Sequence, residues 1–140
     1  MPVSTVRIEN DLSEIAKVDE MLDEFAEQFG IPPAIATTFH VIFDDLLNNV
    51  ISYGFNDGQR HFIDINLELT ANSLIVSIAD DGMPFNPLDE AAPDTKLSIE
   101  DRQIGGLGIH LVIKLVDDVR YERTADKNIL TLTKSFQSKK

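Results

Sequence analysis

The strongest constraint on the fold is a pair of alternating segments in the middle of the chain. The first segment places an apolar side chain at every second position, and the second segment repeats this pattern after a short gap. The apolar positions are Ile63, Ile65, Leu67 and Leu69, followed by Leu74, Val76 and Ile78. A period of two puts each set on one face of a β-strand. With the tight connection at 71–73, the pattern predicts a β-hairpin with one buried face.

Two amphipathic segments before the hairpin predict helices. Asp11 is placed to cap the first helix, with Glu14 as its capping-box partner and Gly30 as the residue that ends it. The apolar residues between these ends recur at helical spacing, at Ile15, Val18, Leu22, Phe25 and Phe29. The second predicted helix covers about 32–53, and its opening prolines suit a first helical turn.

Further short strands complete the predicted sheet, near 3–8, 119–121 and 129–133. Because helical and strand patterns are segregated along the chain, we expect an α+β fold. The expected architecture is a two-layer sandwich, in which helices cover one face of a mixed, mostly antiparallel sheet. No internal repeat or linker interrupts the pattern, so residues 1–140 are predicted to form a single domain.

The charge balance excludes several classes of partner. The chain has 24 Asp and Glu residues against 12 Lys and Arg, a formal net charge of -12. Such a surface repels nucleic acid and anionic membranes, so we expect neither as a partner, whereas a protein with a basic patch fits well. The chain has no cysteine, which removes disulfides and thiolate metal sites. The first residues lack the apolar core of a signal peptide and no apolar run is long enough to span a bilayer, so we expect a cytoplasmic protein.

The second predicted helix carries two acid–asparagine pairs, Asp44 with Asn48 and Asp45 with Asn49. At about 100° per residue, Asp44 and Asn48 lie opposite the apolar stripe, whereas Asp45 and Asn49 lie at its edge. A carboxylate and an amide at that boundary can hold a hard cation and a nucleophilic hydroxyl or water. The alternative is that both are boundary polar residues bonded to neighbouring backbone.

A further polar site follows the hairpin, in the sequence Asp80-Asp81-Gly82. Strand alternation places Asp80 on the buried face and Asp81 on the other. A buried carboxylate needs hydrogen-bond donors, because burying it unpaired is costly. An exocyclic amine such as that of adenine is one candidate donor, and the backbone N–H groups of the following Gly-Met-Pro turn are another.

A long aperiodic segment at 83–103 contains three prolines and predicts a functional lid or a disordered loop. After it, Gly105, Gly106, Leu107 and Gly108 lead into an apolar helix. Glycines let the backbone approach a ligand closely, and free N–H groups at a helix start bind anions. The alternative is a flexible loop end. The string matches neither the dinucleotide fingerprint nor the phosphate loop of the P-loop NTPases.

The remaining polar residues receive structural interpretations. His40, His61 and His110 show no metal-ligand spacing, so we expect no metal cluster among them. His61, at the start of a strand, and His110, in the helix after the glycines, are predicted to lie at the surface. No His or Lys accompanies Ser52 as a base, so Ser52 is predicted to be structural rather than a nucleophile.

The order of these motifs is more informative than any one of them. The chain resembles the GHKL ATPases, whose N, G1 and G2 boxes correspond to a helical D-x-x-x-N, a strand-terminal D-x-G-x-x-F-N-P and, after the long loop, G-G-L-G-I-H-L-V. The closing segments 118–121 and 128–134 also look like the final strands of that family. The resemblance covers nearly the whole chain and is closest to the anti-sigma-factor serine kinases of the RsbW and SpoIIAB type. It implies the GHKL (Bergerat) ATP-binding fold.

The resemblance implies a role for each matching residue. Asn49 would coordinate the Mg²⁺ that bridges the ATP phosphates, and Asp80 would accept a hydrogen bond from the adenine amine. Gly82 would let the backbone pass close to the base. Under a lid formed by 83–103, the start of a helix would face the phosphates through Gly106, Leu107 and Gly108.

Two residues depart from the family pattern. Asp45 stands where the family has a glutamate that acts as general base, which makes it the implied catalytic residue. Its shorter side chain places the carboxylate about 1 Å further from an acceptor hydroxyl or water, and a displacement of that size can cost about a hundredfold in rate. Asn86 stands where the G1 box often has Asp. The pattern therefore supports ATP binding better than phosphoryl transfer.

The resemblance implies a regulatory protein of a partner-switching system. In that reading the chain is a serine/threonine protein kinase that uses ATP and Mg²⁺ to phosphorylate a STAS-domain antagonist. It is also an anti-sigma factor that sequesters a sigma factor or another regulatory protein, and it forms a homodimer. Two alternatives stay open: a non-catalytic module whose affinity for a protein responds to ATP, and a detached ATP-binding domain of a histidine kinase.

Overall fold

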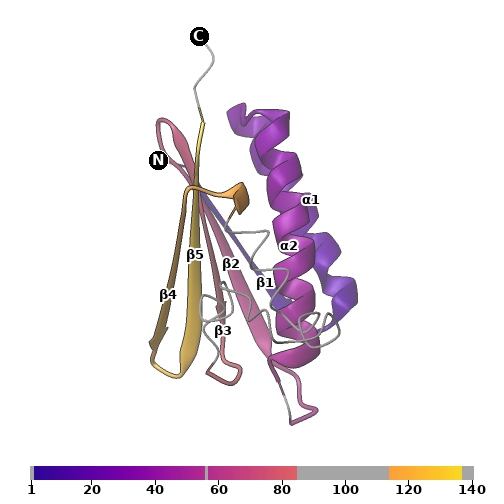
Figure 1. Cartoon of the computed structure of the whole chain (residues 1–140). Helices are drawn as coiled ribbons and strands as arrows, with labels where there is room; N and C mark the ends of the chain where they lie inside the picture. Colours follow the sequence, from indigo (N-terminus) through magenta and orange to yellow (C-terminus); the bar gives the residue numbers. More distant parts are fainter. Residues whose placement is uncertain (1, 56, 85–113, 137–140) are drawn as a thin grey trace, which may run out of the picture.

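The computed structural model describes residues 2–55, 57–84 and 114–136. They form two layers, with both long helices lying across one face of a β-sheet (Figure 1). The predicted two-layer α+β fold is therefore confirmed. The elements, in chain order, are β1 (Val3–Glu9), the 3-10 helix η1 (Leu12–Glu14), α1 (Ile15–Phe29), α2 (Pro33–Tyr53), β2 (Phe62–Leu69), β3 (Ser73–Asp80), β4 (Asp118–Thr124) and β5 (Lys127–Ser135).

The sheet has five strands in the order β1-β2-β3-β5-β4. The predicted hairpin is confirmed, with Ile65 of β2 opposite Ile78 of β3. Every pairing among the described strands is antiparallel. The mostly antiparallel sheet is thus as predicted, and the described strands include no parallel pair that would make it mixed. The strand order places Asp80, at the end of β3, between Ile63 of β2 and Asn128 of β5.

The end of α1 follows the sequence-based expectation, whereas its start does not. Gly30 ends the helix with a φ of 70°, in the left-handed region that glycine adopts without strain. Asp11 caps η1 by accepting from the N–H of Ser13 at 3.0 Å. The predicted capping box does not form, because the η1 turn carries Glu14 back to β1, where its Oε1 accepts from the N–H of Glu9 at 3.2 Å.

The core lies between the helices and the inner face of the sheet. The alternating apolar positions of β2 and β3 face it, as do the apolar stripes of α1 and α2. Its largest fully buried side chains are Ile8, Leu22, Phe39, Ile42, Phe43, Leu47, Ile63, Ile65, Leu67, Leu74 and Leu132. Among the helices that the structure describes, none combines the length and apolarity needed to cross a membrane.

An ion-pair bridge at His40 also joins α1 to α2. Its Nδ1 atom lies 2.7 Å from Asp19 Oδ1, and its Nε2 atom lies 2.7 Å from Asp23 Oδ1. Partial burial lowers the pKa of His40, but the two carboxylates outweigh this effect and hold the pKa above its ordinary value. The bridge therefore favours the protonated ring.

Replacing His40 by Ala is expected to lower the free energy of unfolding more at about pH 6 than at about pH 9. A histidine whose pKa is raised on folding stabilises the fold fully below its ordinary pKa, and this contribution is lost as the pH rises through the folded value. Urea unfolding of the wild type and the variant at both pH values measures the difference. An equal loss of stability at both would show that packing, and not charge, explains the contribution of His40.

Candidate functional site

Helix α2 presents its two acid–asparagine pairs on different sides. Asp44 and Asn48 are exposed, whereas Asp45 and Asn49 are half-buried, as helical geometry predicts. Ser52 Oγ donates to Asn48 Oδ1 at 3.1 Å, which ties it to the exposed pair. Within the described part of the chain, the side chains of Asp45 and Asn49 make no hydrogen bond. Their polar atoms are thus not occupied by neighbouring backbone.

The half-buried pair has the chemistry of a cation and proton-transfer site. Burial raises the pKa of the Asp45 carboxyl, and the adjacent charge of Asp44 adds to this effect. A carboxylate with a raised pKa is a better proton acceptor. One turn along the helix, Asn49 carries an amide oxygen, a ligand suited to a hard cation.

Asp80 ends β3 on the buried side of the sheet, with only 7% of its surface exposed, while Asp81 is exposed. Its Oδ1 atom accepts from the N–H of Gly82 at 2.9 Å and from Asn128 Nδ2 at 3.1 Å. The hydrogen bond from the backbone of the turn, one of the two alternatives that the sequence leaves open for Asp80, is thus present. It ends on Oδ1, the oxygen that Asn128 also contacts. The other oxygen, Oδ2, accepts no hydrogen bond from the described residues. Burial raises the pKa of this carboxyl, and the two hydrogen bonds partly oppose the shift.

The turn after β3 packs against the end of α2. The N–H of Met83 donates to the carbonyl oxygen of Gly54 at 3.0 Å. A Cβ atom on Gly82 would lie 2.4 Å from that same oxygen and 2.9 Å from Asp80 Oδ1. Glycine is therefore required by the close approach of two backbone segments, a reason that the sequence motif does not reveal.

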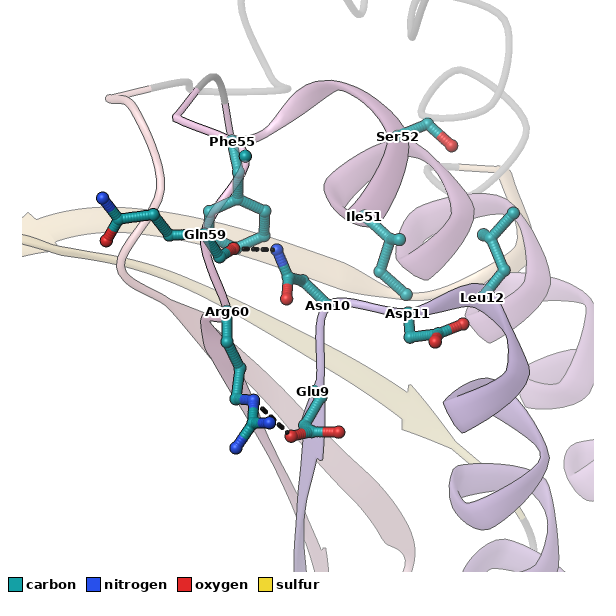
Figure 2. A pocket seen from close by; sticks show the side chains of 10 residues that line it. Glu9, Asn10, Asp11, Leu12, Ile51, Ser52, Phe55, Gln59 and Arg60 are labelled. Carbon is teal, nitrogen blue, oxygen red and sulfur yellow. Dashed lines mark hydrogen bonds and ion pairs between the residues drawn. The ribbon is translucent and has the colours of Figure 1, made fainter.

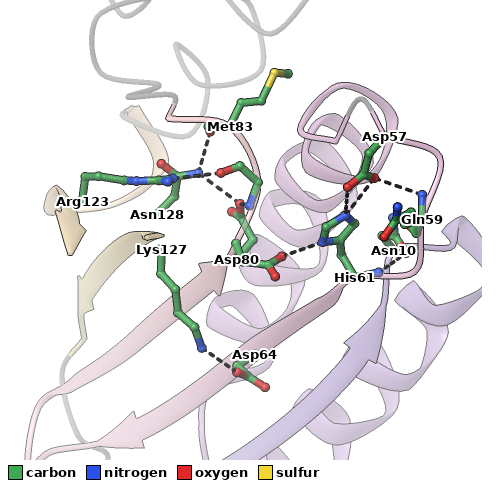
Figure 3. A network of polar contacts seen from close by, with 12 residues as sticks. Asn10, Asp57, Gln59, His61, Asp64, Asp80, Met83, Arg123, Lys127 and Asn128 are labelled. Carbon is green, nitrogen blue, oxygen red and sulfur yellow. Dashed lines mark hydrogen bonds and ion pairs between the residues drawn. The ribbon is translucent and has the colours of Figure 1, made fainter. Parts of the chain in front are cut away.

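Asn128 of β5 is a site residue that sequence reasoning missed (Figure 3). It is 7% exposed, and its Nδ2 atom donates to Asp80 Oδ1 at 3.1 Å and to the carbonyl oxygen of Met83 at 2.8 Å. The hydroxyl of Tyr121, on β4, donates to Asn128 Oδ1. Asn128 thus holds both the Asp80 carboxylate and the turn that follows it.

Arg123 of β4 was also missed, and it holds the same turn by donating from Nη1 to the carbonyl oxygen of Gly82 at 2.8 Å (Figure 3). For Asn128 a signal was present in the sequence. It alternates with Leu130 and Leu132, so the reasoning that placed Asp80 on the buried face also places Asn128 there.

His61 lies near the surface, as the sequence predicts, but it makes contacts that the sequence does not predict. Its side chain is only 18% exposed, with Nε2 2.8 Å from Asp57 Oδ2 and Nδ1 3.0 Å from Asp81 Oδ1. Its ring stacks on that of Phe55, with 4.5 Å between the centroids. His61 thus lies at the surface with its ring partly covered by Phe55 and Asp57 of the segment between α2 and β2.

A broad cleft of about 720 Å³ lies where β1, η1 and the end of α2 meet (Figure 2). Its charged and polar groups largely satisfy one another, since Arg60 pairs with Glu9 at 2.9 Å and Asn10 Nδ2 donates to the carbonyl oxygen of Gln59 at 3.1 Å. None of the predicted site residues in the described chain lines this cleft. We therefore assign it no part in the candidate site.

Several predicted residues lie outside the described part of the chain and stay predictions. They are Gly106, Leu107 and Gly108, Asn86, His110 and all but the first two residues of the 83–103 segment. Among the described residues, no group of three or more His, Asp or Glu side chains is placed to hold a metal ion.

Known proteins with similar sequences point to one family. A family model described as a histidine kinase-like ATPase domain matches residues 8–134. The chain is 32% identical over 96 residues to the serine/threonine-protein kinase BtrW of Bordetella bronchiseptica. The aligned residues cover 69% of this chain and 68% of that protein. Domains of the matched family generally bind ATP.

Solved structures of histidine kinases share the fold. The catalytic domain of the histidine kinase ThkA, in a nucleotide-free form, matches with a TM-score of 0.53 and 16% identity over 96% of this chain and 97% of that one. The Acinetobacter baumannii histidine kinase AdeS matches with a TM-score of 0.50 and 15% identity over 99% of this chain and 70% of that one. At these identities the likeness concerns the fold alone. Because the family model spans most of the sequence and the fold agrees with it, the chain belongs to the histidine kinase-like ATPase (GHKL) family.

Proposed function

We propose that the protein is a serine/threonine kinase of a partner-switching system. It binds ATP with Mg²⁺ and transfers the γ-phosphoryl group to a serine of a STAS-domain antagonist. While that antagonist is phosphorylated, the protein acts as an anti-sigma factor and sequesters a sigma factor or another regulatory protein. The similarity to a serine/threonine-protein kinase supports this class, and the net charge of -12 suits a partner with a basic surface. A cytoplasmic homodimer is part of the proposal.

The observation that carries ATP binding is the second oxygen of Asp80. The side chain is buried and its Oδ1 already accepts from Gly82 and Asn128, but Oδ2 has no donor among the described residues. A buried acceptor without a donor is costly, and a ligand N–H removes that cost. The exocyclic amine of adenine supplies such an N–H group. The residues present therefore fit an adenine nucleotide.

Asn49 and Asp45 would divide the chemistry. Bound ATP with Mg²⁺ supplies the phosphoryl group and neutralises charge that develops on its oxygens. Asn49 would offer its amide oxygen to the cation. Asp45 would hold the serine hydroxyl of the partner and accept its proton as the hydroxyl oxygen bonds to phosphorus and ADP leaves. The backbone of Gly106, Leu107 and Gly108 is proposed to face the phosphates.

A second candidate function is a non-catalytic module that binds ATP and changes its affinity for a protein. The specific observation in its favour is the short side chain of Asp45, which stands where the family has glutamate. This module would use Asp80 and Asn49 in the same way but would transfer no phosphoryl group. The two functions therefore differ in the role of Asp45 and in whether a phosphorylated partner is produced.

Replacing Asp45 by Glu is expected to raise the rate of phosphoryl transfer by about tenfold or more, because the added methylene carries the carboxylate about 1 Å closer to the acceptor hydroxyl. Asp45→Ala is expected to abolish transfer while ATP still binds. Incubation with γ-labelled ATP and the STAS-domain partner measures the rate. Asn48→Ala is the matched control, because it removes a polar side chain of the exposed pair and should leave transfer close to wild type.

The outcomes separate the two candidate functions. Label that still reaches the partner with Asp45→Ala would remove Asp45 as the base. If no label is transferred but ATP binds and changes the affinity for the partner, the non-catalytic module is correct. Binding of ATP·Mg²⁺ by Asn49→Ala with wild-type affinity would contradict the assignment of the cation ligand.

A further inference from the structure

His61 joins the segment that follows α2 to the turn that follows β3 (Figure 3). Its Nε2 atom lies 2.8 Å from Asp57 Oδ2, and its Nδ1 atom lies 3.0 Å from Asp81 Oδ1. A neutral imidazole has one N–H group and donates to one carboxylate, whereas the protonated ring donates to both. Hydrogen bonding to Asp57, with a further contribution from Asp81, raises the pKa of His61 above its ordinary value. The geometry therefore suits a charged ring held between two carboxylates.

The residues around His61 hold it in place. Its backbone N–H donates to Asn10 Oδ1 at 3.0 Å, and its carbonyl oxygen accepts from the N–H of Asn10 at 3.0 Å. Phe55 stacks on the ring with 14° between the planes. Asp57 Oδ1 accepts from the N–H of Gln59 at 3.0 Å. His61 is thus anchored to the chain just after β1, and its ring reaches from this anchor to the end of β3.

The residue that the ring reaches, Asp81, lies between the two residues of the proposed adenine contact. Asp80 precedes it, and Gly82 follows it and donates to Asp80 Oδ1 at 2.9 Å. This turn is held on the side of α2 by its backbone bond to the helix end, and on the side of β5 by Asn128. Arg123 of β4 holds the carbonyl oxygen of Gly82, and the side chain of Asp81 contacts His61. Among the described residues, the bridge from Asp57 through His61 to Asp81 is therefore one of several connections that fix the turn.

We propose that His61 is a positioning residue for the nucleotide site: through Asp57 and Asp81 it fixes the turn that carries Asp80, and nucleotide affinity falls when alkaline pH opens this bridge. The inference rests on the proposed binding of ATP. In the described chain, the ring packs against the segment after α2 and the end of β3, and Asp57 and Asp81 are the titratable groups that contact it. After the ring loses its proton, one of the two carboxylates loses its donor, and the turn loses a connection.

Calorimetric titration with ADP and Mg²⁺ at about pH 6 and about pH 9 tests this inference. Between about pH 6 and about pH 9 the affinity of wild type is expected to fall by about threefold to tenfold more than the affinity of His61→Gln. A factor of this size corresponds to the loss of one hydrogen bond. Glutamine carries no charge, so His61→Gln should bind weakly at both pH values. Comparing the two proteins cancels the titration of the nucleotide and of other groups.

Two further variants test the charge and the contact separately. His61→Arg keeps a positive charge and several donors at both pH values, so it should bind tightly at both. Asp81→Ala removes the acceptor that the ring reaches and should reproduce the behaviour of His61→Gln. The matched control is His40→Gln, which removes a similar histidine bridge between α1 and α2. It should leave the pH profile of nucleotide affinity as in wild type.

If wild type and His61→Gln lose affinity in parallel, the inference is overturned. If wild type binds no nucleotide at either pH, the proposed function fails, and hydrogen exchange then decides the positioning role. The amide of Gly82 is bonded to Asp80 Oδ1 and reports on the turn. Its protection factor should fall between the two pH values in wild type but not in His61→Arg. Equal changes in both proteins would refute the inference.

Discussion

Replacing Asp80 by Asn is expected to weaken ATP binding by about tenfold to a hundredfold, the value of a hydrogen bond to a charged group. Asparagine keeps an oxygen that accepts from Gly82 and Asn128, so the turn retains its bonds. It replaces the second carboxylate oxygen by an amide NH₂ group. In the proposed complex this change sets a donor against the adenine amine, which is also a donor.

The same variant is expected to be more stable than wild type at neutral pH in the absence of nucleotide. Burial raises the pKa of Asp80 in the folded protein, and the bonds from Asn128 and Gly82 only partly oppose this. A carboxyl with a raised folded pKa favours folding below its ordinary pKa, and this contribution is lost as the pH rises through the folded value. At about pH 7 the buried carboxylate therefore lowers the free energy of unfolding, whereas a neutral amide does not.

Calorimetric titration with ATP and Mg²⁺, together with urea unfolding of the free protein, measures both effects of Asp80→Asn. Glu122→Gln is a suitable control, because it neutralises an exposed acid on β4 and should change neither quantity. ATP binding by Asp80→Asn with wild-type affinity would contradict the adenine contact. A joint loss of affinity and stability would point to a damaged fold and would contradict the predicted gain in stability.

Replacing Gly82 by Ala is expected to weaken ATP binding by about tenfold or more and to lower the free energy of unfolding by about 1 to 3 kcal/mol. The added Cβ would lie 2.4 Å from the carbonyl oxygen of Gly54, a backbone atom that a rotamer change cannot move. Relief of this contact separates the turn from α2 and breaks the bond from Met83 to Gly54. Because the same Cβ would also lie 2.9 Å from Asp80 Oδ1, the separation displaces the proposed adenine acceptor.

Gly30→Ala is the matched control for Gly82→Ala. Gly30 has a φ of +70°, and a Cβ built there meets no atom within 4 Å. Alanine at Gly30, at the end of α1, should cost about 1 to 2 kcal/mol through backbone strain, with ATP affinity unchanged. Unfolding and nucleotide titration of the two variants separate strain from steric contact. Wild-type affinity in Gly82→Ala would mean that the turn and α2 can separate without moving Asp80.

Periodicity alone predicted the orientation of the polar residues. Asp45 and Asn49 are half-buried and Asp44 and Asn48 exposed, because the angle between successive helical residues does not depend on the rest of the chain. The burial of Asp80 followed from strand alternation in the same way. Such predictions succeed where the local backbone geometry is the only cause. They say nothing about what each side chain meets.

The contacts that sequence reasoning missed join residues far apart in the chain. Asn128 reaches Asp80 across 48 positions, and His61 reaches Asp81 across 20. The first contact depends on the register of β3 with β5, and the second on the path of the segment between α2 and β2. Neither register nor path follows from composition or periodicity, because many pairings of the same segments bury the same apolar faces.

The sequence by itself determined the two-layer architecture, the faces of its helices and strands and, through the order of its motifs, the resemblance to the family. These features follow from local periodicity and from chemistry at fixed spacing. Only the tertiary structure decided how Asp80 is held, with Asn128 on one oxygen, the end of α2 against Gly82, and His61 on Asp81. The physical reason is that each of these contacts exists only once distant segments have packed at one register.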